Sequence, residues 1–206
     1  MILKNKKVLV TGGAGFIGSH LAETLVNQGA EVIVLDNLAS GHISNLGVFR
    51  DSIDFIQGDI RDEDILSQAI RNCDTVFHQA AVVSVTQTVN QPVDSARVNE
   101  LGTIKVLEAA RRARVRRVVL ASSSAVYGDA PQLPKLESMA PHPLSPYAVQ
   151  KLTNEYYAAL YYRLYRLETV CLRYFNVFGP RQDPSSPYSG VISIFMTKAS
   201  HGQIPA

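Results

Sequence analysis

The sequence predicts an α/β fold in which helices cover both faces of a doubly wound parallel sheet. Three observations predict it: short apolar runs alternate with helix-like segments, a glycine-rich turn follows the first run, and polar residues recur where the runs end. Such alternation is typical of a parallel sheet, because each strand needs a helical crossover before the next. Ligands of these sheets bind beyond the carboxyl ends of the strands.

The N-terminal part of the chain is expected to form a βαβ unit. The apolar run from Lys7 to Val10 predicts a buried strand, and the segment from Phe16 to Asn27 predicts a helix. A second strand is expected from Glu31 to Leu35, ending at Asp36. The following segment, residues 37–51, is rich in Gly, Ser and Asn and is expected to be a loop.

The rest of the chain continues this alternation. Further strands are expected at residues 54–57, 75–78, 117–121 and 169–173, and further helices at residues 63–71, 93–114 and 147–165. A loop with five prolines leads into the last of these helices. Polar residues at 36, 59, 79–81, 122–124 and 174–176 follow the expected strands, which predicts a site at one edge of the sheet.

The glycine-rich turn has the spacing of a Rossmann dinucleotide-binding site. Gly12 permits the tight turn after the first strand, Gly15 leaves room for a pyrophosphate, and Gly18 lets the helix lie close to the sheet. Free N–H groups at the helix start favour an anion there. Asp36 is expected to accept hydrogen bonds from the adenosine ribose and to repel a 2′-phosphate, so NAD is favoured over NADP. The alternative is a structural glycine turn in an unrelated α/β domain.

Tyr147 and Lys151 lie one helical turn apart, downstream of the serines 122–124. A tyrosine has a pKa near 10 in water, and a nearby ammonium group lowers it. Tyr147 is therefore expected to act as a general base near neutral pH, while Lys151 holds the nicotinamide ribose. A Tyr-x-x-x-Lys pair is common by chance, but behind a dinucleotide motif it predicts redox chemistry on an alcohol.

Composition excludes several classes of protein. The chain has 206 residues, 46% hydrophobic and 18% charged, and a net charge of +2, which gives no attraction to nucleic acid. A basic run from Arg111 to Arg117 falls at an expected helix C-terminus, where cations are favourable. Cys73 and Cys171 are expected to be buried thiols in a reducing cytosol. We recognise no signal peptide and no apolar run that spans a bilayer, so a cytoplasmic protein is expected.

Seven motifs distributed along the chain resemble those of one enzyme family. They are TGGAGFIG at 11–18, Asp36-Asn37, GDI at 58–60, HQAA at 78–81, SSSAVYGD at 122–129, SPYAVQK at 145–151 and LRYFNVFGPRQDP at 172–184. Together they resemble the extended short-chain dehydrogenase/reductase family, and within it the nucleotide-sugar 4-epimerases that act on UDP-hexoses and their N-acetylated forms.

The resemblance implies roles for individual residues. The catalytic residues would be Ser123, Tyr147 and Lys151. The NAD-binding residues would be Gly12, Gly15, Phe16, Ile17, Gly18, Asp36, Asn37, Asp59, Ile60, Gln79, Ala80, Ala81, Asn99, Tyr147, Lys151 and Tyr174. The substrate-binding residues would be Ser84, Ser123, Ser124, Tyr147 and Asn176. No metal site is expected, and His20 and His78 are expected to be packed structural residues.

The resemblance also implies an organisation in two parts. Residues 1–180 would form the NAD-binding Rossmann domain, and residues 181–206 would begin a nucleotide-sugar-binding region that is largely missing from this chain. A homodimer would form through the helices around 94–112 and 147–165. Sugar dehydratases of the family carry an acidic pair at Ser124-Ala125, and decarboxylases keep a Glu at Ala125. Both stay as alternatives that these residues disfavour, beside a non-catalytic fragment that only binds NAD.

Overall fold

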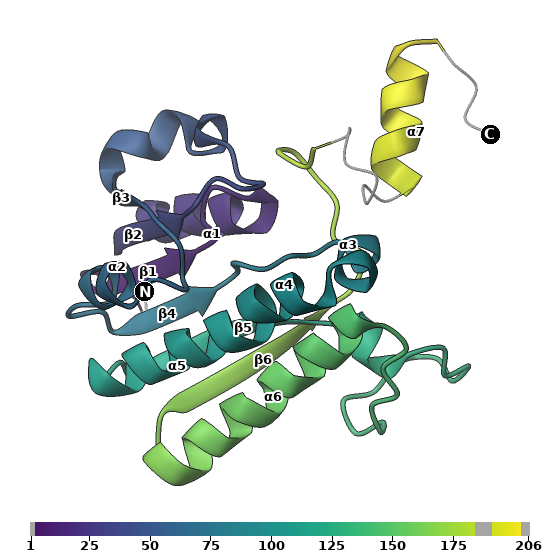
Figure 1. The fold of residues 1–206 in the computed structure, drawn as a ribbon. Helices are drawn as coiled ribbons and strands as arrows, with labels where there is room; N and C mark the ends of the chain where they lie inside the picture. The colour runs from purple at the N-terminus through teal and green to yellow at the C-terminus, as the bar shows by residue number, and fades with distance from the viewer. Residues whose placement is uncertain (1–2, 184–190, 203–206) are drawn as a thin grey trace.

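A six-stranded parallel sheet forms the centre of the computed structural model, which describes residues 3–183 and 191–202 (Figure 1). Its strands are β1 (Lys7–Thr11), β2 (Glu31–Asp36), β3 (Ile53–Gln57), β4 (Thr75–His78), β5 (Arg117–Ser123) and β6 (Glu168–Tyr174). They lie in the order β3-β2-β1-β4-β5-β6, and every pair is parallel. The chain reverses its direction of winding between β1 and β4, which confirms the predicted doubly wound sheet and places its switch point there.

Seven α-helices accompany the sheet in the described part of the chain. They are α1 (Phe16–Asn27), α2 (Glu63–Ala69), α3 (Val85–Asn90), α4 (Pro92–Ala96), α5 (Thr103–Arg112), α6 (Pro146–Tyr165) and α7 (Val191–Ser200). Shorter helical turns are η1 (Ile43–Asn45), η2 (Gly47–Ser52), the π-helical η3 (Arg97–Gly102) and η4 (Ser124–Tyr127). None of the helices described here has both the length and the apolar character needed to cross a bilayer.

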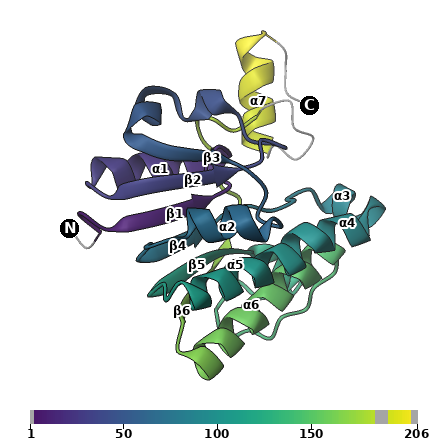
Figure 2. The ribbon, with the colours of Figure 1, turned by 60° about the vertical axis from the view of Figure 1, so that its left-hand side comes forward.

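Two hydrophobic clusters bury the two faces of the sheet, and Figure 2 shows helices on both sides. Alternate residues of β1 separate them: Leu9 packs with α2, α5 and α6, whereas Val8 and Val10 pack with α1 and η2. The second face is covered less evenly, because Val170 and Leu172 on β6 are each 40% exposed. The helices therefore cover the central strands, whose carboxyl ends carry the predicted site residues.

Two expectations about local structure differ from the fold. The expected helix over 93–114 is α4 and α5 joined through the wider turn η3, and the expected loop over 37–51 contains η1 and most of η2. Phe49 is buried against α1 there, which orders the segment despite its Gly and Ser content. Helix α3 was not expected; Ser84 caps it by accepting a hydrogen bond from the Gln87 N–H at 2.8 Å.

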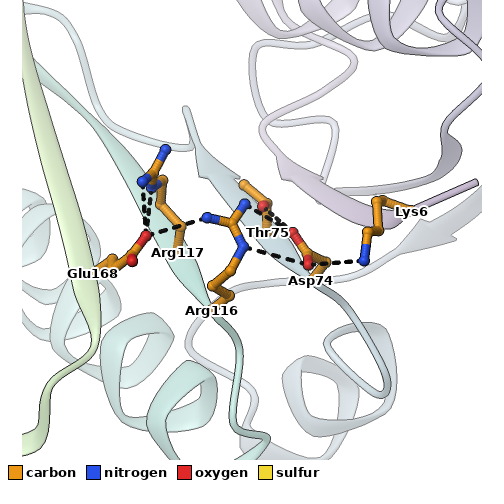
Figure 3. A network of polar contacts seen from close by, with 6 residues as sticks. All are labelled: Lys6, Asp74, Thr75, Arg116, Arg117 and Glu168. Carbon is orange, nitrogen blue, oxygen red and sulfur yellow. Dashed lines mark hydrogen bonds and ion pairs between the residues drawn. The ribbon is translucent and has the colours of Figure 1, made fainter. Parts of the chain in front are cut away.

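Ion pairs join four strands at the edge of the sheet opposite to the predicted site (Figure 3). The Arg116 guanidinium contacts Asp74 at 3.1 Å and Glu168 at 3.2 Å, and Arg117 contacts Glu168 at 2.7 Å. Lys6 adds a contact of 3.7 Å to Asp74. The network connects the starts of β1, β4, β5 and β6. Arg111 and Arg112 pair with Glu108, so four of the five arginines of the basic run form ion pairs within the fold.

We expect Asp74→Asn to lower the free energy of unfolding by about 1 kcal/mol, because partly exposed ion pairs are screened by water. The hydrogen bond from Arg116 and its charge lower the pKa of Asp74 below its ordinary value of 3.8. A lowered carboxyl pKa stabilises the fold above the unfolded pKa, and this contribution is lost as the pH falls through the folded pKa. Urea unfolding at pH 7 and pH 3 should therefore show a difference that shrinks at pH 3. Asp51→Asn, on the exposed η2, is the control; an equal loss at both pH values would contradict the assignment.

Candidate active site

The predicted site residues gather at the carboxyl edge of the sheet. Gly12 follows β1, Asp36 ends β2, Gln79 follows β4, Ser123 ends β5 and Tyr174 ends β6. Because all six strands are parallel, their carboxyl ends meet along this one edge. The fold therefore brings together residues that lie up to 162 positions apart, from Gly12 to Tyr174.

The glycine-rich turn is built by close approach of three backbone segments. Gly12 has a φ of +69°, and a Cβ there would lie 2.6 Å from the Ala80 nitrogen, at the switch point between β1 and β4. A Cβ on Gly18 would overlap with the Gly12 carbonyl. At Gly15, by contrast, the Gly12 carbonyl oxygen at 3.2 Å is the single neighbour found within 4 Å among the residues described. Helix α1 thus begins at an open position, where its first N–H groups have no side-chain cap.

Asp36 is a buried carboxylate beside this turn, 8% exposed. Its Oδ2 accepts a hydrogen bond from the Ala14 N–H at 2.9 Å, and its Oδ1 accepts one from the Leu38 N–H at 2.8 Å. Each carboxylate oxygen has a second lone pair, so Asp36 can accept further hydrogen bonds from a hydroxyl group. Two bonds to backbone hold it in place with its negative charge at the end of β2.

Asp59 is fixed by a neighbour that was not predicted. Arg61 donates to it from Nε and Nη2 and from its backbone nitrogen, each at 2.8 Å, and Asn37 donates at 2.9 Å. The Arg61 hydrogen bonds hold the pKa of Asp59 far below its usual range, although partial burial acts in the opposite direction. The next residue, Ile60, points into the hydrophobic core against Gly102. A cofactor contact at Ile60 would therefore come from its backbone.

Asn99 joins the loop after β4 to α6 through a network of buried hydrogen bonds. It is 1% exposed, its Oδ1 accepts from the Val82 N–H at 2.8 Å, and its Nδ2 donates to the Val82 carbonyl at 2.9 Å and to Gln150 at 2.7 Å. The Gln150 amide in turn donates to Ser95 at 2.9 Å. The Asn99 side chain therefore fastens the loop after β4 to α6, and its contact with NAD stays a prediction.

Gln79 and Tyr174 face each other across the ends of β4 and β6. Burial raises the pKa of Tyr174, and the Gln79 amide partly counteracts this rise. The amide lies near the hydroxyl without the geometry of a good hydrogen bond, since Gln79 Nε2 is buried and has no such partner in the described part of the chain. A buried amide without a partner is costly, which marks this position as one that a ligand could satisfy.

Helix α6 places Tyr147 and Lys151 next to Ser123. Ser145 caps the helix by accepting from the Ala148 N–H at 3.2 Å, and Pro146 occupies its first turn. The Lys151 ammonium donates to the Ala121 carbonyl at 2.8 Å and lies 5.7 Å from the centre of the Tyr147 ring. Ser123 is in hydrogen-bonding range of the Tyr147 hydroxyl. The three groups form one cluster beyond β5.

The electrostatics of this cluster differ from the expectation. Burial raises the pKa of Tyr147 above its ordinary value of 10, although the Ser123 hydrogen bond acts to lower it. Burial also lowers the pKa of Lys151 to about 8. The expected lowering of the Tyr147 pKa is therefore not found, because desolvation of the phenolate is the largest cause and raises the pKa.

A buried ion pair supports the cluster from behind. Arg173 on β6 donates to Glu155 on α6 at 2.9 Å and 2.8 Å, and Ser122 donates to Glu155 at 2.5 Å. The Arg173 guanidinium also stacks on the Tyr127 ring, 4.7 Å from its centre. Glu155 lies one turn after Lys151 on α6, so helical spacing was a signal in the sequence for this residue.

The predicted substrate residues lie at unequal distances from the cluster. Ser124 begins η4 directly after Ser123, whereas the hydroxyl of Ser84 is buried and used to cap α3. Asn176 is exposed on the segment that follows β6. His78 is structural as expected: it is buried between Thr11 at 2.7 Å and Thr103 at 2.9 Å, and burial lowers its pKa to about 3.

A groove of about 530 Å³ lies elsewhere, between α2 and α5. Its walls include Leu66, Ile70 and Ile104 but none of the predicted site residues. The predicted site at the strand ends is therefore separate from this groove.

Comparison with known proteins identifies relatives of this chain. Residues 8–206 match the model of the NAD dependent epimerase/dehydratase family. A UDP-glucose 4-epimerase from Mycolicibacterium smegmatis is 42% identical over 193 residues, which are 92% of this chain and 61% of that protein.

Solved structures agree with this relationship. A UDP-N-acetylglucosamine 4-epimerase from Methanobrevibacter ruminantium, in complex with UDP-N-acetylmuramic acid, superimposes with a TM-score of 0.93 at 41% identity, covering 97% of this chain and 64% of that one. The UDP-glucose 4-epimerase of Thermus thermophilus in complex with NAD gives a TM-score of 0.88 at 44% identity, covering 96% of this chain and 63% of that one.

The chain thus spans a little over 60% of the length of these relatives. Almost its whole length takes part in each match, at identities well above those that indicate a shared fold alone. The chain belongs to the NAD-dependent epimerase/dehydratase family.

Proposed function

We propose that the protein is an NAD-dependent nucleotide-sugar 4-epimerase that interconverts UDP-glucose with UDP-galactose, or the N-acetylated pair. The observation that carries the proposal is the cluster of Ser123, Tyr147 and Lys151 at the same sheet edge as the glycine-rich turn. The turn provides for a dinucleotide and the cluster for proton transfer to and from an alcohol. The similar epimerases from M. smegmatis and T. thermophilus support the choice of reaction.

The residues at the glycine-rich turn fit NAD. Gly15 leaves open space where a Cβ would otherwise project, and the uncapped N–H groups of α1 favour a pyrophosphate there. Asp36 has free lone pairs for ribose hydroxyls and a charge that disfavours a 2′-phosphate. The unpartnered Gln79 amide would gain a partner near the nicotinamide end. The T. thermophilus relative was solved with NAD.

In the proposed reaction, Tyr147 moves the proton and Ser123 shares its hydrogen bond. Tyr147 takes the proton from the sugar 4-hydroxyl as the C4–H bond breaks, and gives it back to the oxygen of the 4-keto sugar when that bond re-forms on the opposite face. NAD, when bound, supplies the reversible hydride acceptor. Lys151 holds the nicotinamide ribose, and its charge favours the tyrosinate form of Tyr147.

Two alternatives from the same family fit less well. Elimination of water from the sugar would need acidic residues where the chain has Ser124 and Ala125. A fragment that only binds NAD would have no need for the aligned Ser123, Tyr147 and Lys151.

We divide the chain into an NAD-binding domain, residues 1–180, and the start of a nucleotide-sugar-binding region, residues 181–206.

We also propose a homodimer formed by the helices around 94–112 and 147–165. Helix α6 exposes apolar and aromatic side chains on its outer face, namely Tyr156, Leu160, Tyr162, Leu164 and Tyr165. Exposed apolar patches of this kind favour a protein partner.

Cys73 and Cys171 are free thiols, in keeping with the proposed cytosolic location.

The decisive test is product analysis with the full-length protein. We expect UDP-glucose or UDP-N-acetylglucosamine to be converted into its C4 epimer while absorbance at 340 nm stays constant, because the hydride returns to the sugar in every cycle. Accumulation of NADH in step with product would contradict the proposal. A 4-keto-6-deoxy product would show dehydratase chemistry instead.

We expect Asp36→Asn to weaken NAD binding by about 10- to 100-fold, since hydrogen bonds to a charged group contribute roughly 1.5–3 kcal/mol. NADP binding should weaken less or improve, because the negative charge is removed. Calorimetric titration of both dinucleotides measures this change in preference. Asp54→Asn, an exposed carboxylate on the neighbouring β3, is the matched control. An unchanged ratio of NAD to NADP affinity would disprove the role of Asp36.

We expect Tyr147→Phe to remove most turnover while NAD stays bound, and Ser123→Ala to cost a smaller part of the ~10²–10⁴-fold typical of proton-transfer assistance. Lys151→Met should weaken NAD binding and move the ascending limb of the pH–rate profile, on which Tyr147 loses its proton, to higher pH. The shift is toward higher pH because loss of the Lys151 cation disfavours tyrosinate and so raises the pKa of Tyr147. Profiles of NAD-saturated wild type and Lys151→Met test this. Identical limbs would reduce Lys151 to a cofactor contact.

A further inference from the structure

The segment 175–181 crosses the site from the catalytic side to the cofactor side. At its start, the Phe175 ring lies 6.3 Å from the Tyr127 ring on η4, the turn that follows Ser123. At its end, the Pro180 carbonyl and the Arg181 guanidinium contact α1, the helix that follows the glycine-rich turn. Asn176, which is expected to contact the substrate, lies between these two anchors.

Arg181 forms the stronger of the two contacts with α1. Its Nη2 donates to Glu23 at 2.5 Å, and its guanidinium lies 5.7 Å from the centre of the Phe49 ring on η2. The paired side chains are 23% and 28% exposed, so water screens them less than a surface pair. Arg181 also has a φ of +66°, a conformation that L residues adopt rarely and that persists where surrounding contacts impose it.

His20 provides a second contact one turn earlier on α1. Its Nε2 is 2.8 Å from the Pro180 carbonyl, and because a carbonyl only accepts, Nε2 must carry the proton. The imidazole packs edge-on against Phe16, with 5.7 Å between the ring centres. Gly179 lies over the same Phe16 ring, where a Cβ would be 3.7 Å away. The end of segment 175–181 therefore lies across the first two turns of α1.

We propose that His20 and Arg181 are positioning residues that hold segment 175–181 on α1 and so place Asn176 for the nucleotide-sugar. The inference rests on the proposed function. It assigns a role to two residues that make no contact with the catalytic cluster, and it extends the expectation that His20 is merely packed. Helix α1 directly follows the glycine-rich turn that is expected to bind the cofactor. The position of Asn176 therefore depends on the helix that also shapes the cofactor site.

The geometry favours fixed placement over a loose loop. From Asn176 to Pro180 the chain has four residue steps, a reach of at most about 14 Å. With both ends fastened, one to η4 and one to α1, Asn176 has little freedom to leave the site. Breaking the α1 anchor leaves Asn176 held from the side of β6 and the Phe175 ring, so the asparagine gains freedom to move.

The test uses the full-length, NAD-loaded protein in a Tyr147→Phe background, so that binding is measured without turnover. Arg181→Met keeps the stem over Phe49 but removes the pair with Glu23, and His20→Phe keeps the packing on Phe16 but removes the donor. We expect Arg181→Met and His20→Phe each to weaken UDP-glucose binding by about 3- to 10-fold. Binding of UDP-N-acetylglucosamine is measured in parallel. His20→Gln and Arg181→Lys, which keep a donor or the charge, should recover part of the affinity. In the active background KM should rise while kcat stays within about twofold.

A double-mutant cycle separates positioning from general loss of stability. If Arg181 acts through Asn176, then adding Arg181→Met to Asn176→Ala costs no further affinity. Amide hydrogen exchange of residues 175–181 should also accelerate in Arg181→Met. Arg116→Met is the control: it breaks ion pairs at the opposite sheet edge and should leave UDP-sugar binding unchanged.

Three outcomes overturn the inference: additive effects in the cycle, unchanged UDP-sugar affinity in both Arg181→Met and His20→Phe, or faster exchange without any loss of affinity. If the unmodified protein neither binds nor converts either UDP-sugar, the proposed function itself fails. That result is seen in the wild-type arm alone, so the two failures are distinguishable.

Discussion

The close approach of backbone at Gly12 is the constraint on which the site depends. Its left-handed φ turns the chain out of β1, and the absence of a Cβ lets the loop after β4 pass directly against it. Gly18, in the first turn of α1, must also lack a Cβ, because a Cβ there would overlap with the carbonyl of Gly12. Any side chain at either position would clash with backbone and push β1, β4 and α1 apart. The catalytic cluster and segment 175–181 are both positioned relative to these three elements.

Buried polar groups transmit that position to the catalytic helix. Asn99 uses its amide on the Val82 backbone and on Gln150, while its own carbonyl accepts from Asn154 at 2.9 Å. Two residues of α6 are thereby fastened to the loop after β4, on either side of Lys151 in the sequence. These directional hydrogen bonds fix the rotation of α6 more narrowly than apolar packing alone, although the Asn154 Oδ1 is buried without a hydrogen-bond partner in the described part of the chain. This rotation decides whether Tyr147 faces Ser123.

The sequence predicted the sheet, the glycine-rich turn and the proximity of Tyr147 to Lys151 because these depend on local patterns. Apolar periodicity follows burial, and a turn with three glycines reports its own backbone geometry. It could not predict that Asn99 would spend its amide on Val82, or that His20 would meet Pro180, because such pairs join residues up to 160 positions apart and depend on how helices dock. The wrong direction for the pKa of Tyr147 has a similar origin. Spacing along a helix shows that a lysine is near, but only the fold shows how much water the phenol has lost.

Burial disfavours the charged forms of both Tyr147 and Lys151. The pKa of Lys151 falls to about 8 while that of Tyr147 rises, so desolvation opposes the charged form of each. Burial therefore makes Tyr147 harder to ionise than a tyrosine in water. A positive charge brought beside the phenol would favour tyrosinate, and an oxidised nicotinamide carries such a charge. Burial also makes such a charge more effective, since the charge acts through a medium of low dielectric constant. Base strength in this site is thus expected to depend on an occupied cofactor crevice, which couples proton transfer to the presence of a hydride acceptor.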